Sequence, residues 1–166
     1  MTVLQVEKNA TELTMVITTE FAASVDSVWR LWADAQLFER WWGPPGAMPT
    51  SEEHDMTPGG RIAFFFTGPE GDKYPNVWEV LEVEPPTHLV LRDADVDEDG
   101  TPTDGNSLTK LEISVVAAGD KTRMVVTSHF DSAEGMKEAI AMGIEEGMQL
   151  TIGKAEAVLA EVVASA

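Results

Sequence analysis

The chain has 166 residues, in which 29 Asp and Glu stand against 11 Lys and Arg, for a formal net charge of -18. So negative a field repels phosphate backbones and anionic lipid leaflets, and we expect neither nucleic acid nor a membrane as a partner. The absence of cysteine excludes disulfides, zinc–thiolate sites and cysteine nucleophiles. Because no apolar run approaches about 20 residues and the N-terminus lacks a secretory pattern, we expect a cytoplasmic protein.

The N-terminal part of the chain predicts one strand followed by two short helices. Apolar and polar side chains alternate over residues 13–22, as in a strand with one face on a core. Ser24 is a candidate N-cap for a helix through Asp34, because the apolar residues between them recur at helical spacing. A second short helix over residues 37–42 is ended by the Gly-Pro-Pro-Gly of residues 43–46.

From there to about residue 132 the sequence predicts strands joined by short turns. Clusters of Gly, Pro and Asp separate segments that are mostly rich in β-branched and aromatic residues. The predicted strands cover residues 47–56, 61–67, 74–83, 88–93, 108–116 and 122–130. Short turns between consecutive strands favour an antiparallel meander over crossover connections.

A long helical segment is predicted from about residue 133. Gly143 and Gly147 each cost about 1 kcal/mol relative to Ala inside a helix, so we expect a break or kink there. The residues that follow form one apolar stripe at helical spacing. The stripe consists of Met148, Ile152, Ala155, Leu159 and Val162.

These elements predict an α+β fold in a single domain over residues 1–166, with a core over about 12–163. A curved antiparallel sheet of about six to seven strands would wrap around the long C-terminal helix, with two short helices after the first strand. Incomplete filling between the helix and the sheet would leave a cavity.

Five segments carry more specific motifs, above all the tandem Trp-Trp-Gly-Pro of residues 41–44. The segments are residues 28–32, 38–44, 55–61, 81–86 and 143–148. In this order they resemble the START and Bet v 1-like helix-grip superfamily (SRPBCC), in the branch named after the activator of the heat-shock-protein-90 ATPase. The resemblance implies a helix-grip fold whose relatives hold lipids, hormones or polyketides in the cavity, and in a few cases catalyse cyclisation there.

Large aromatic side chains gather in the first helices and in the strands. Trp29, Trp32 and Trp41 are predicted to fill the core. The resemblance places the end of the second helix near a pocket mouth, and other aromatic residues lie on strands predicted to face the terminal helix. With two residues from the terminal helix, these positions give a predicted ligand-binding set of Trp42, Phe64, Phe66, Trp78, Met148 and Ile152.

Three histidines, His54, His88 and His129, are isolated in the sequence and lack metal-ligand spacing. His54 completes the predicted ligand-binding set, because strict alternation puts Glu52, His54 and Met56 on one strand face. If that face points inward, His54 and Glu52 would be polar groups in an apolar cavity, able to orient a ligand or to move a proton. The alternative is a solvated edge strand.

Residues 95–106 match the D-x-D-x-D-G start of a calcium loop. Asn106 replaces the bidentate Glu at the last position, and Pro102 replaces the usual branched residue, so an acidic hairpin tip is the simpler interpretation. The chain also lacks a nucleophile elbow, a P-loop and a dinucleotide fingerprint. We therefore expect no metal and no cofactor.

The sequence favours a binding protein for a small apolar or amphipathic molecule, as a monomer or a homodimer. One alternative is a co-chaperone or stress-response module, as the name of the family branch implies, with a chaperone as its partner. The other is a cyclase- or dehydratase-type enzyme, which needs two titratable groups in the cavity. His54 and Glu52 are the only such pair that the sequence offers.

Overall fold

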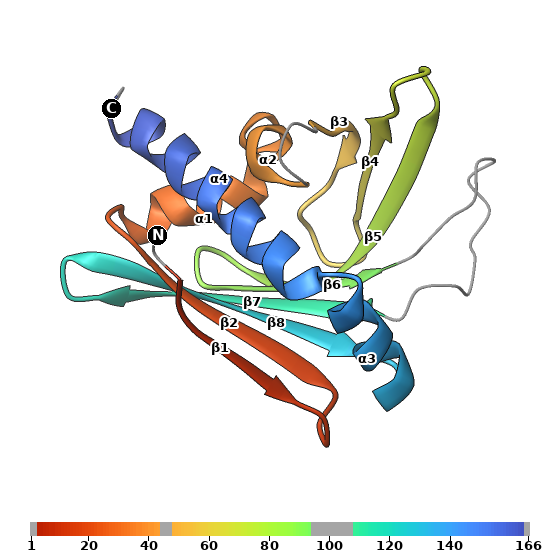
Figure 1. The fold of residues 1–166 in the computed structure, drawn as a ribbon. Coiled ribbons are helices and arrows are strands. Elements are labelled where there is room, and N and C mark those ends of the chain that lie inside the picture. The colour runs from red at the N-terminus through yellow and green to blue at the C-terminus, as the bar shows by residue number, and fades with distance from the viewer. Residues whose placement is uncertain (1–2, 44–47, 94–107, 165–166) are drawn as a thin grey trace.

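The computed structural model describes residues 3–43, 48–93 and 108–164. Eight strands form one antiparallel sheet in the order β1-β2-β8-β7-β6-β5-β4-β3, and the long helix α4 crosses it diagonally (Figure 1). The strands are β1 (Val3–Asn9), β2 (Thr14–Phe21), β3 (Thr50–His54), β4 (Arg61–Thr67), β5 (Lys73–Glu84), β6 (His88–Asp93), β7 (Leu108–Ala118) and β8 (Lys121–Phe130). The helices are α1 (Val25–Ala33), α2 (Ala35–Trp41), α3 (Ala133–Ala141) and α4 (Ile144–Ala164).

The predicted α+β helix-grip architecture is confirmed, with eight strands in place of six to seven. The additional strand is β1, which pairs antiparallel with β2 and was not predicted. It lies at the edge of the sheet, and Gln5, Glu7 and Lys8 are exposed. Because an edge strand of this kind buries little apolar surface, its sequence carries only a weak hydrophobic pattern.

Two side-chain caps set the first two helices. The Ser24 hydroxyl accepts a hydrogen bond from the Ser27 N–H at 3.1 Å, which confirms the predicted N-cap of α1. Asp34 ends α1 in an extended conformation, and its carboxylate accepts hydrogen bonds from the N–H groups of Gln36 (2.9 Å) and Leu37 (3.4 Å). One aspartate thus ends α1 and begins α2, so the chain turns without a separate loop.

The predicted break in the C-terminal helical segment occurs at Gly143 and not at Gly147. Gly143 has φ +91°, a left-handed conformation that glycine adopts without the usual steric cost, and it separates α3 from α4. Gly147 lies inside α4 and donates its N–H to the Gly143 carbonyl oxygen at 2.9 Å. Its low helix propensity is overridden because the rest of α4 packs on the sheet.

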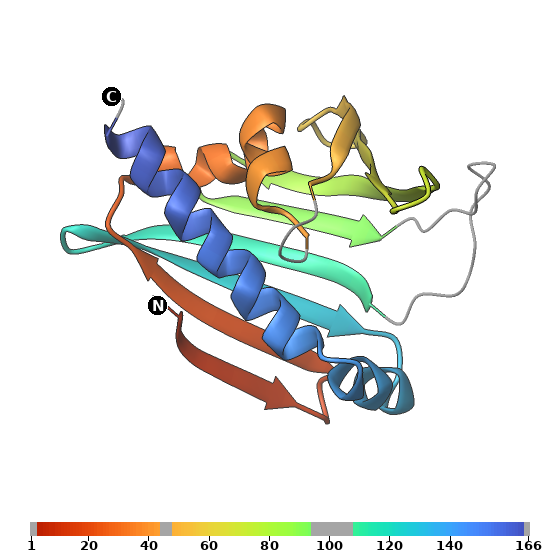
Figure 2. The ribbon, with the colours of Figure 1, turned by 45° about the horizontal axis from the view of Figure 1, so that its top comes forward.

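The core lies between the concave face of the sheet and the helices that cover it (Figure 2). Alternate residues of β2 and β8 point inward and are buried, and α4 contributes Ile152, Ala155 and Leu159 to the same core. Trp29, Trp32 and Trp41 are buried as predicted. The Trp41 indole N–H donates to the Leu31 carbonyl oxygen at 2.7 Å, which satisfies the polar end of a fully buried ring.

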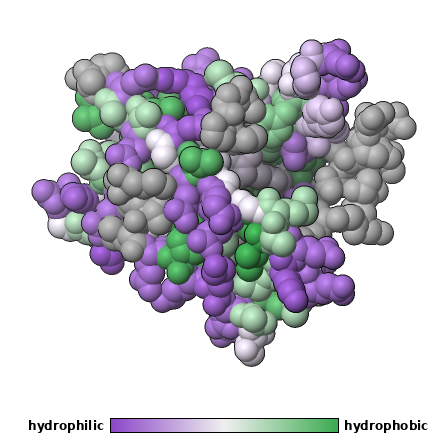
Figure 3. Space-filling view, in the orientation of Figure 1, coloured by the Kyte–Doolittle hydropathy of each residue, from purple (hydrophilic) through white to green (hydrophobic). Residues whose placement is uncertain are grey.

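The outer surface agrees with the acidic composition. Seen from the side of α4, it is largely hydrophilic with scattered apolar residues (Figure 3). Among the described residues, no helix combines the length and the hydropathy that crossing a bilayer requires.

Candidate functional site

A cluster of aromatic rings fills the space between α2 and the β4–β5 strand pair, with Phe38 of α2 at its centre. The Phe38 ring stacks on Trp42 with a centroid distance of 5.6 Å and an interplanar angle of 14°. It meets Phe64 and Trp78 edge-on at 5.5 and 5.8 Å. Edge-on and stacked pairs at such distances are favourable, so the rings form one rigid wall.

A groove of about 250 Å³ opens beside this wall, where the end of α2 and strand β4 face the first half of α4. Its lining is predominantly apolar. The lining residues are Trp42, Gly43, Phe66, Ile144, Gly147, Met148 and Thr151.

Local geometry explains why these residues meet. The lining residues of α4 occupy positions i, i+3, i+4 and i+7, counted from Ile144, so they form one stripe along the helix. Ile62, Phe64 and Phe66 alternate along β4 on its inner face, and Phe66 is the last and least buried of the three. Gly43 follows α2 with φ +100°, which turns the chain across the Phe66 ring.

One end of the groove is polar. The carbonyl oxygen of Gly43 accepts a hydrogen bond from the Thr151 hydroxyl at 3.0 Å and another from the Lys154 ammonium at 3.1 Å. Partial burial lowers the pKa of Lys154, because the charged form loses water contacts. Further along α4, Glu161 forms an ion pair with Arg40 of α2, so polar contacts at two points join the two helices.

The structure places three of the predicted ligand-binding residues in the groove lining and three behind it. Trp42, Phe66 and Met148 line the groove. The other three, Phe64, Trp78 and Ile152, have exposed fractions of 1%, 6% and 1% and belong to the core. Phe64 packs edge-on against Phe66 at 5.8 Å, and Trp78 packs edge-on against Trp42 at 4.9 Å. The buried rings therefore support the rings that line the groove.

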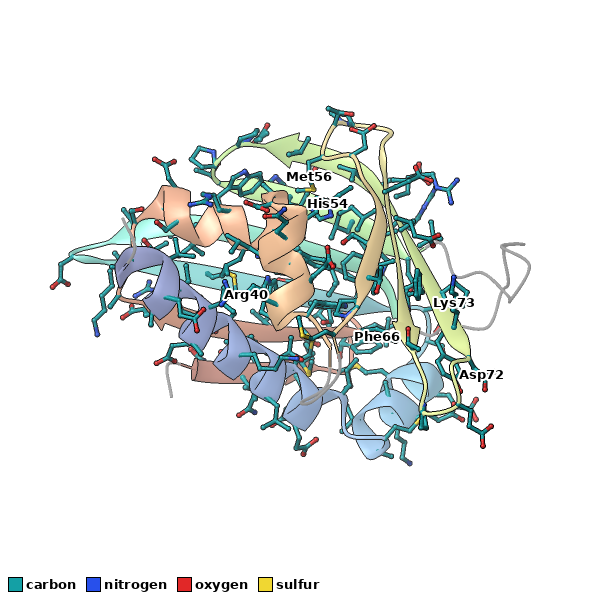
Figure 4. The ribbon with its side chains drawn as sticks, turned by 90° about the horizontal axis from the view of Figure 1, so that it is seen from above. Arg40, His54, Met56, Phe66, Asp72 and Lys73 are labelled. Carbon is teal, nitrogen blue, oxygen red and sulfur yellow. The ribbon has the colours of Figure 1, made fainter. Side chains whose placement is uncertain are left out.

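His54 lies outside the groove lining. It is half-buried, and because a backbone carbonyl can only accept, its Nε2–H donates to the Trp32 carbonyl oxygen at 2.7 Å. Its ring contacts Phe38 at a centroid distance of 5.5 Å, and the other neighbours of Phe38 include Trp42. Figure 4 shows His54 and Met56 near one end of the β3–β4 strand pair and Phe66 near the other.

The prediction that Glu52 shares a face with His54 is wrong, because β3 contains a bulge. Ser51 pairs with Phe64, whereas Glu53 pairs with Ala63, so Glu52 is an extra residue in the strand. Glu52 and Glu53 are both exposed, and Ser51 and His54 are half-buried. One inserted residue shifts the alternation by one position and sends the Glu52 side chain to solvent.

Several groove residues were not predicted. Ile144 and Thr151 continue the helical spacing of Met148 in both directions, which is the signal that could have identified them. Gly43 belongs to the Trp-Trp-Gly-Pro motif, but its carbonyl contact with α4 depends on tertiary structure. Gly147 was expected to interrupt the helix and instead lines the groove.

A second cluster lies on the outer face of the sheet. Glu112 of β7 has one carboxylate oxygen 3.3 Å from His88 Nε2 of β6 and the other 3.4 Å from His129 Nε2 of β8. Partial burial works against ionisation of Glu112, but the contacts with the two histidines outweigh it and lower the pKa of this carboxyl group.

Within the residues that the structure describes, no group of three or more His, Asp or Glu side chains is arranged to hold a metal ion. The calcium-loop candidate, residues 95–106, lies outside the described residues.

Comparisons with known proteins agree with this fold. The sequence model of the family described as "Activator of Hsp90 ATPase homolog 1-like protein" matches residues 22–160. An NMR structure from Arthrobacter aurescens is 40% identical, with 96% of this chain and 93% of that chain covered and a TM-score of 0.88. The crystal structure of protein Ms6760 from Mycobacterium smegmatis is 34% identical, with 96% and 99% covered and a TM-score of 0.85.

A crystal structure of the AHSA1 protein from Silicibacter pomeroyi shares the fold at 21% identity, with 89% and 97% of the chains covered and a TM-score of 0.70. The comparison with curated proteins gives no match. The chain belongs to the Activator of Hsp90 ATPase homolog 1-like family, within the Bet v 1-like helix-grip superfamily.

Proposed function

We propose that this member of the Activator of Hsp90 ATPase homolog 1-like family binds a small apolar or amphipathic molecule in the groove between Trp42, Phe66 and the first half of α4. The observation that carries the proposal is the groove itself, about 250 Å³ of space with an almost entirely apolar lining. Small-molecule sites combine such a lining with a few fixed polar groups. Here the polar groups are the Thr151 hydroxyl and the Gly43 backbone.

The size of the groove limits the ligand. Its volume is just below the roughly 300–1,000 Å³ of pockets that hold drug-sized molecules, which suits one aromatic ring with a short chain. The faces of Trp42 and Phe66 offer flat apolar surface to such a ring. Each Å² of apolar surface removed from water contributes about 25 cal/mol, and this burial is the main driving force for binding.

Titration with phenylbutanol tests the proposal, with binding followed by the backbone amide NMR signals of the protein. We expect saturable shifts for Trp42, Phe66 and Met148. The variant Gly147→Leu fills the groove, because a Cβ at Gly147 meets no heavy atom within 4 Å, and it should abolish these shifts. Leu150→Ala, at a half-exposed position of α4 outside the lining, is the control and should bind normally.

Absence of saturable shifts in the wild-type protein, or equal shifts in Gly147→Leu, would contradict the proposal. Native mass spectrometry of protein purified from its own host can then identify the natural ligand. A co-purifying molecule that is lost from Gly147→Leu and retained by Leu150→Ala would be assigned to the groove.

The alternative of a cyclase- or dehydratase-type enzyme loses its proposed pair of titratable groups. Glu52 is exposed, and His54 lies outside the groove lining. The co-chaperone alternative rests on the description of the family and needs a docking surface away from the groove. The large apolar side chains exposed in the described residues are dispersed over several elements. They are Met48, Tyr74, Val116, Met142, Leu150 and Val163.

A further inference from the structure

Among the groove-lining residues that the structure describes, Thr151 alone carries a hydroxyl group. It lies on the same stripe of α4 as Gly147 and Met148 and is 5% exposed. Its Oγ1 atom donates to the Gly43 carbonyl oxygen at 3.0 Å. A hydroxyl group has a single hydrogen, so the hydrogen of Thr151 is held by Gly43 and is not available to a ligand.

The two oxygen atoms at this end of the groove differ in what they still offer. The Gly43 carbonyl oxygen accepts from Thr151 Oγ1 and from Lys154 Nζ, at 3.0 and 3.1 Å, which uses both of its lone pairs. The Thr151 oxygen also has two lone pairs, and no donor from the described residues reaches them. A ligand that covers this oxygen without donating to it would remove an acceptor from water, at a cost in affinity.

We infer that the ligand of the groove is an amphipathic alcohol, whose apolar part lies against the rings of Trp42 and Phe66 and whose O–H group donates to Thr151 Oγ1. This inference rests on the proposed function and adds the chemical class of the ligand. A carboxylate has no hydrogen to donate and cannot form this bond. A ligand ammonium could donate, but it would lie beside the Lys154 ammonium, and like charges repel.

The test compares phenylbutanol with its methyl ether, which keeps the apolar part and the oxygen but has no O–H donor, by isothermal titration calorimetry at neutral pH. The measured quantity is the ratio of the two affinities in one protein, because this ratio cancels effects of a substitution that are common to both probes. Thr151→Val removes the acceptor oxygen and keeps the shape of the side chain. We expect the ratio of alcohol to ether affinity to be about fivefold higher in the wild-type protein than in Thr151→Val.

Three further variants complete the test. Thr151→Ala also removes the oxygen, has the better helix propensity, and should show the same loss if Thr151→Val folds poorly. Thr151→Ser keeps the hydroxyl group and should keep the wild-type ratio. Leu150→Ala, at a half-exposed position of α4 outside the lining, is the matched control and should also keep this ratio. Phenylbutanoate, a third probe with the same apolar part, should bind the wild-type protein more weakly than phenylbutanol.

The outcomes separate the inference from the proposed function. Equal ratios in the wild-type protein and in the variants without the hydroxyl group would overturn the inference and leave the proposed function in place. Loss of the wild-type ratio in Thr151→Ser or in Leu150→Ala would overturn it as well, and so would tighter binding of phenylbutanoate than of phenylbutanol by the wild-type protein. If neither the alcohol nor the ether binds any of the proteins at millimolar concentration, both the inference and the proposed function are wrong.

Discussion

Gly43 lies against the ring of Phe66: a Cβ atom on Gly43 would stand 2.6 Å from Cε1 of that ring. The contact joins the end of α2 to strand β4 and forms one corner of the groove. Glycine is required there for two reasons, the close approach of the ring and the φ of +100°.

Gly43→Ala should therefore destabilise the fold and distort the groove. The left-handed backbone and the displacement of the Phe66 ring together should lower the free energy of unfolding by about 2–4 kcal/mol, measured by urea denaturation. Gly71→Ala is a matched control, because Gly71 has φ +88° and a Cβ there meets no atom within 4 Å. If Gly43→Ala and Gly71→Ala lower the free energy of unfolding equally, the left-handed backbone alone accounts for the loss and the contact with Phe66 contributes nothing further.

Most of the fold could be predicted because its signals are local. Flanking turn residues and a content rich in β-branched and aromatic residues predicted β4 and β6 with the bounds that the structure has, and the capping side chain of Ser24 marked the start of α1. Strand β1 gave no comparable signal because it is a largely exposed edge strand. The bulge at Glu52 depends on the pairing of β3 with β4, and a single strand sequence does not encode that register.

The candidate site could be predicted only in part. Phe64 and Phe66 share the same alternation, and only the position of α4 above β4 decides that Phe66 lines the groove while Phe64 is buried. His88 and His129 are far apart in the sequence and reach Glu112 only because β6, β7 and β8 are neighbours in the sheet. Both cases depend on tertiary arrangement rather than on local pattern.

Gly147→Ala should stabilise α4 and weaken ligand binding at the same time. Alanine has the better helix propensity by about 1 kcal/mol, and its methyl group would project into open space at the groove. Gly153→Ala offers the same gain in propensity at a helical position that is not in the lining, also with no atom within 4 Å of the added Cβ. Thermal unfolding should show both variants to be more stable than wild type, and calorimetry with phenylbutanol should show weaker binding only for Gly147→Ala. Weaker binding in both variants would mean that a more rigid α4 lowers the affinity, and that the methyl group added at position 147 does not act by filling part of the groove.

His54→Ala should lower stability with little effect on the groove. The variant removes the 2.7 Å hydrogen bond that joins β3 to the Trp32 carbonyl of α1, at a cost of about 1–3 kcal/mol when an acceptor is left without its donor. Because His54 contacts Phe38 and is not in the lining, the affinity for phenylbutanol should change less than twofold. Urea denaturation and calorimetry measure the two effects. A large loss of affinity in a folded His54→Ala protein would instead support the sequence-based expectation that His54 contacts the ligand.

Glu112 should make the stability of the protein depend on pH. Contacts with His88 and His129 outweigh the effect of partial burial and hold the pKa of Glu112 below its ordinary value of 4.5. A carboxyl group whose pKa is lower in the folded state stabilises that state above the unfolded pKa, and this contribution is lost as the pH falls through the folded pKa. Glu112→Gln should therefore be less stable than wild type at neutral pH, and the difference should narrow below pH 4.5.

Urea denaturation of wild type and Glu112→Gln, from neutral pH to below pH 4.5, measures the difference in their free energies of unfolding. Glu82→Gln is the control, at an exposed glutamate of β5, which β6 separates from β7 in the sheet. The control should show no comparable change with pH. A difference between wild type and Glu112→Gln that stays constant from neutral to acid pH would mean that Glu112 acts through the shape of its side chain and not through its charge. If the difference in free energy of unfolding from wild type becomes smaller at acid pH for Glu112→Gln and not for Glu82→Gln, the contacts of Glu112 with His88 and His129 link three strands of the sheet, β6, β7 and β8, electrostatically.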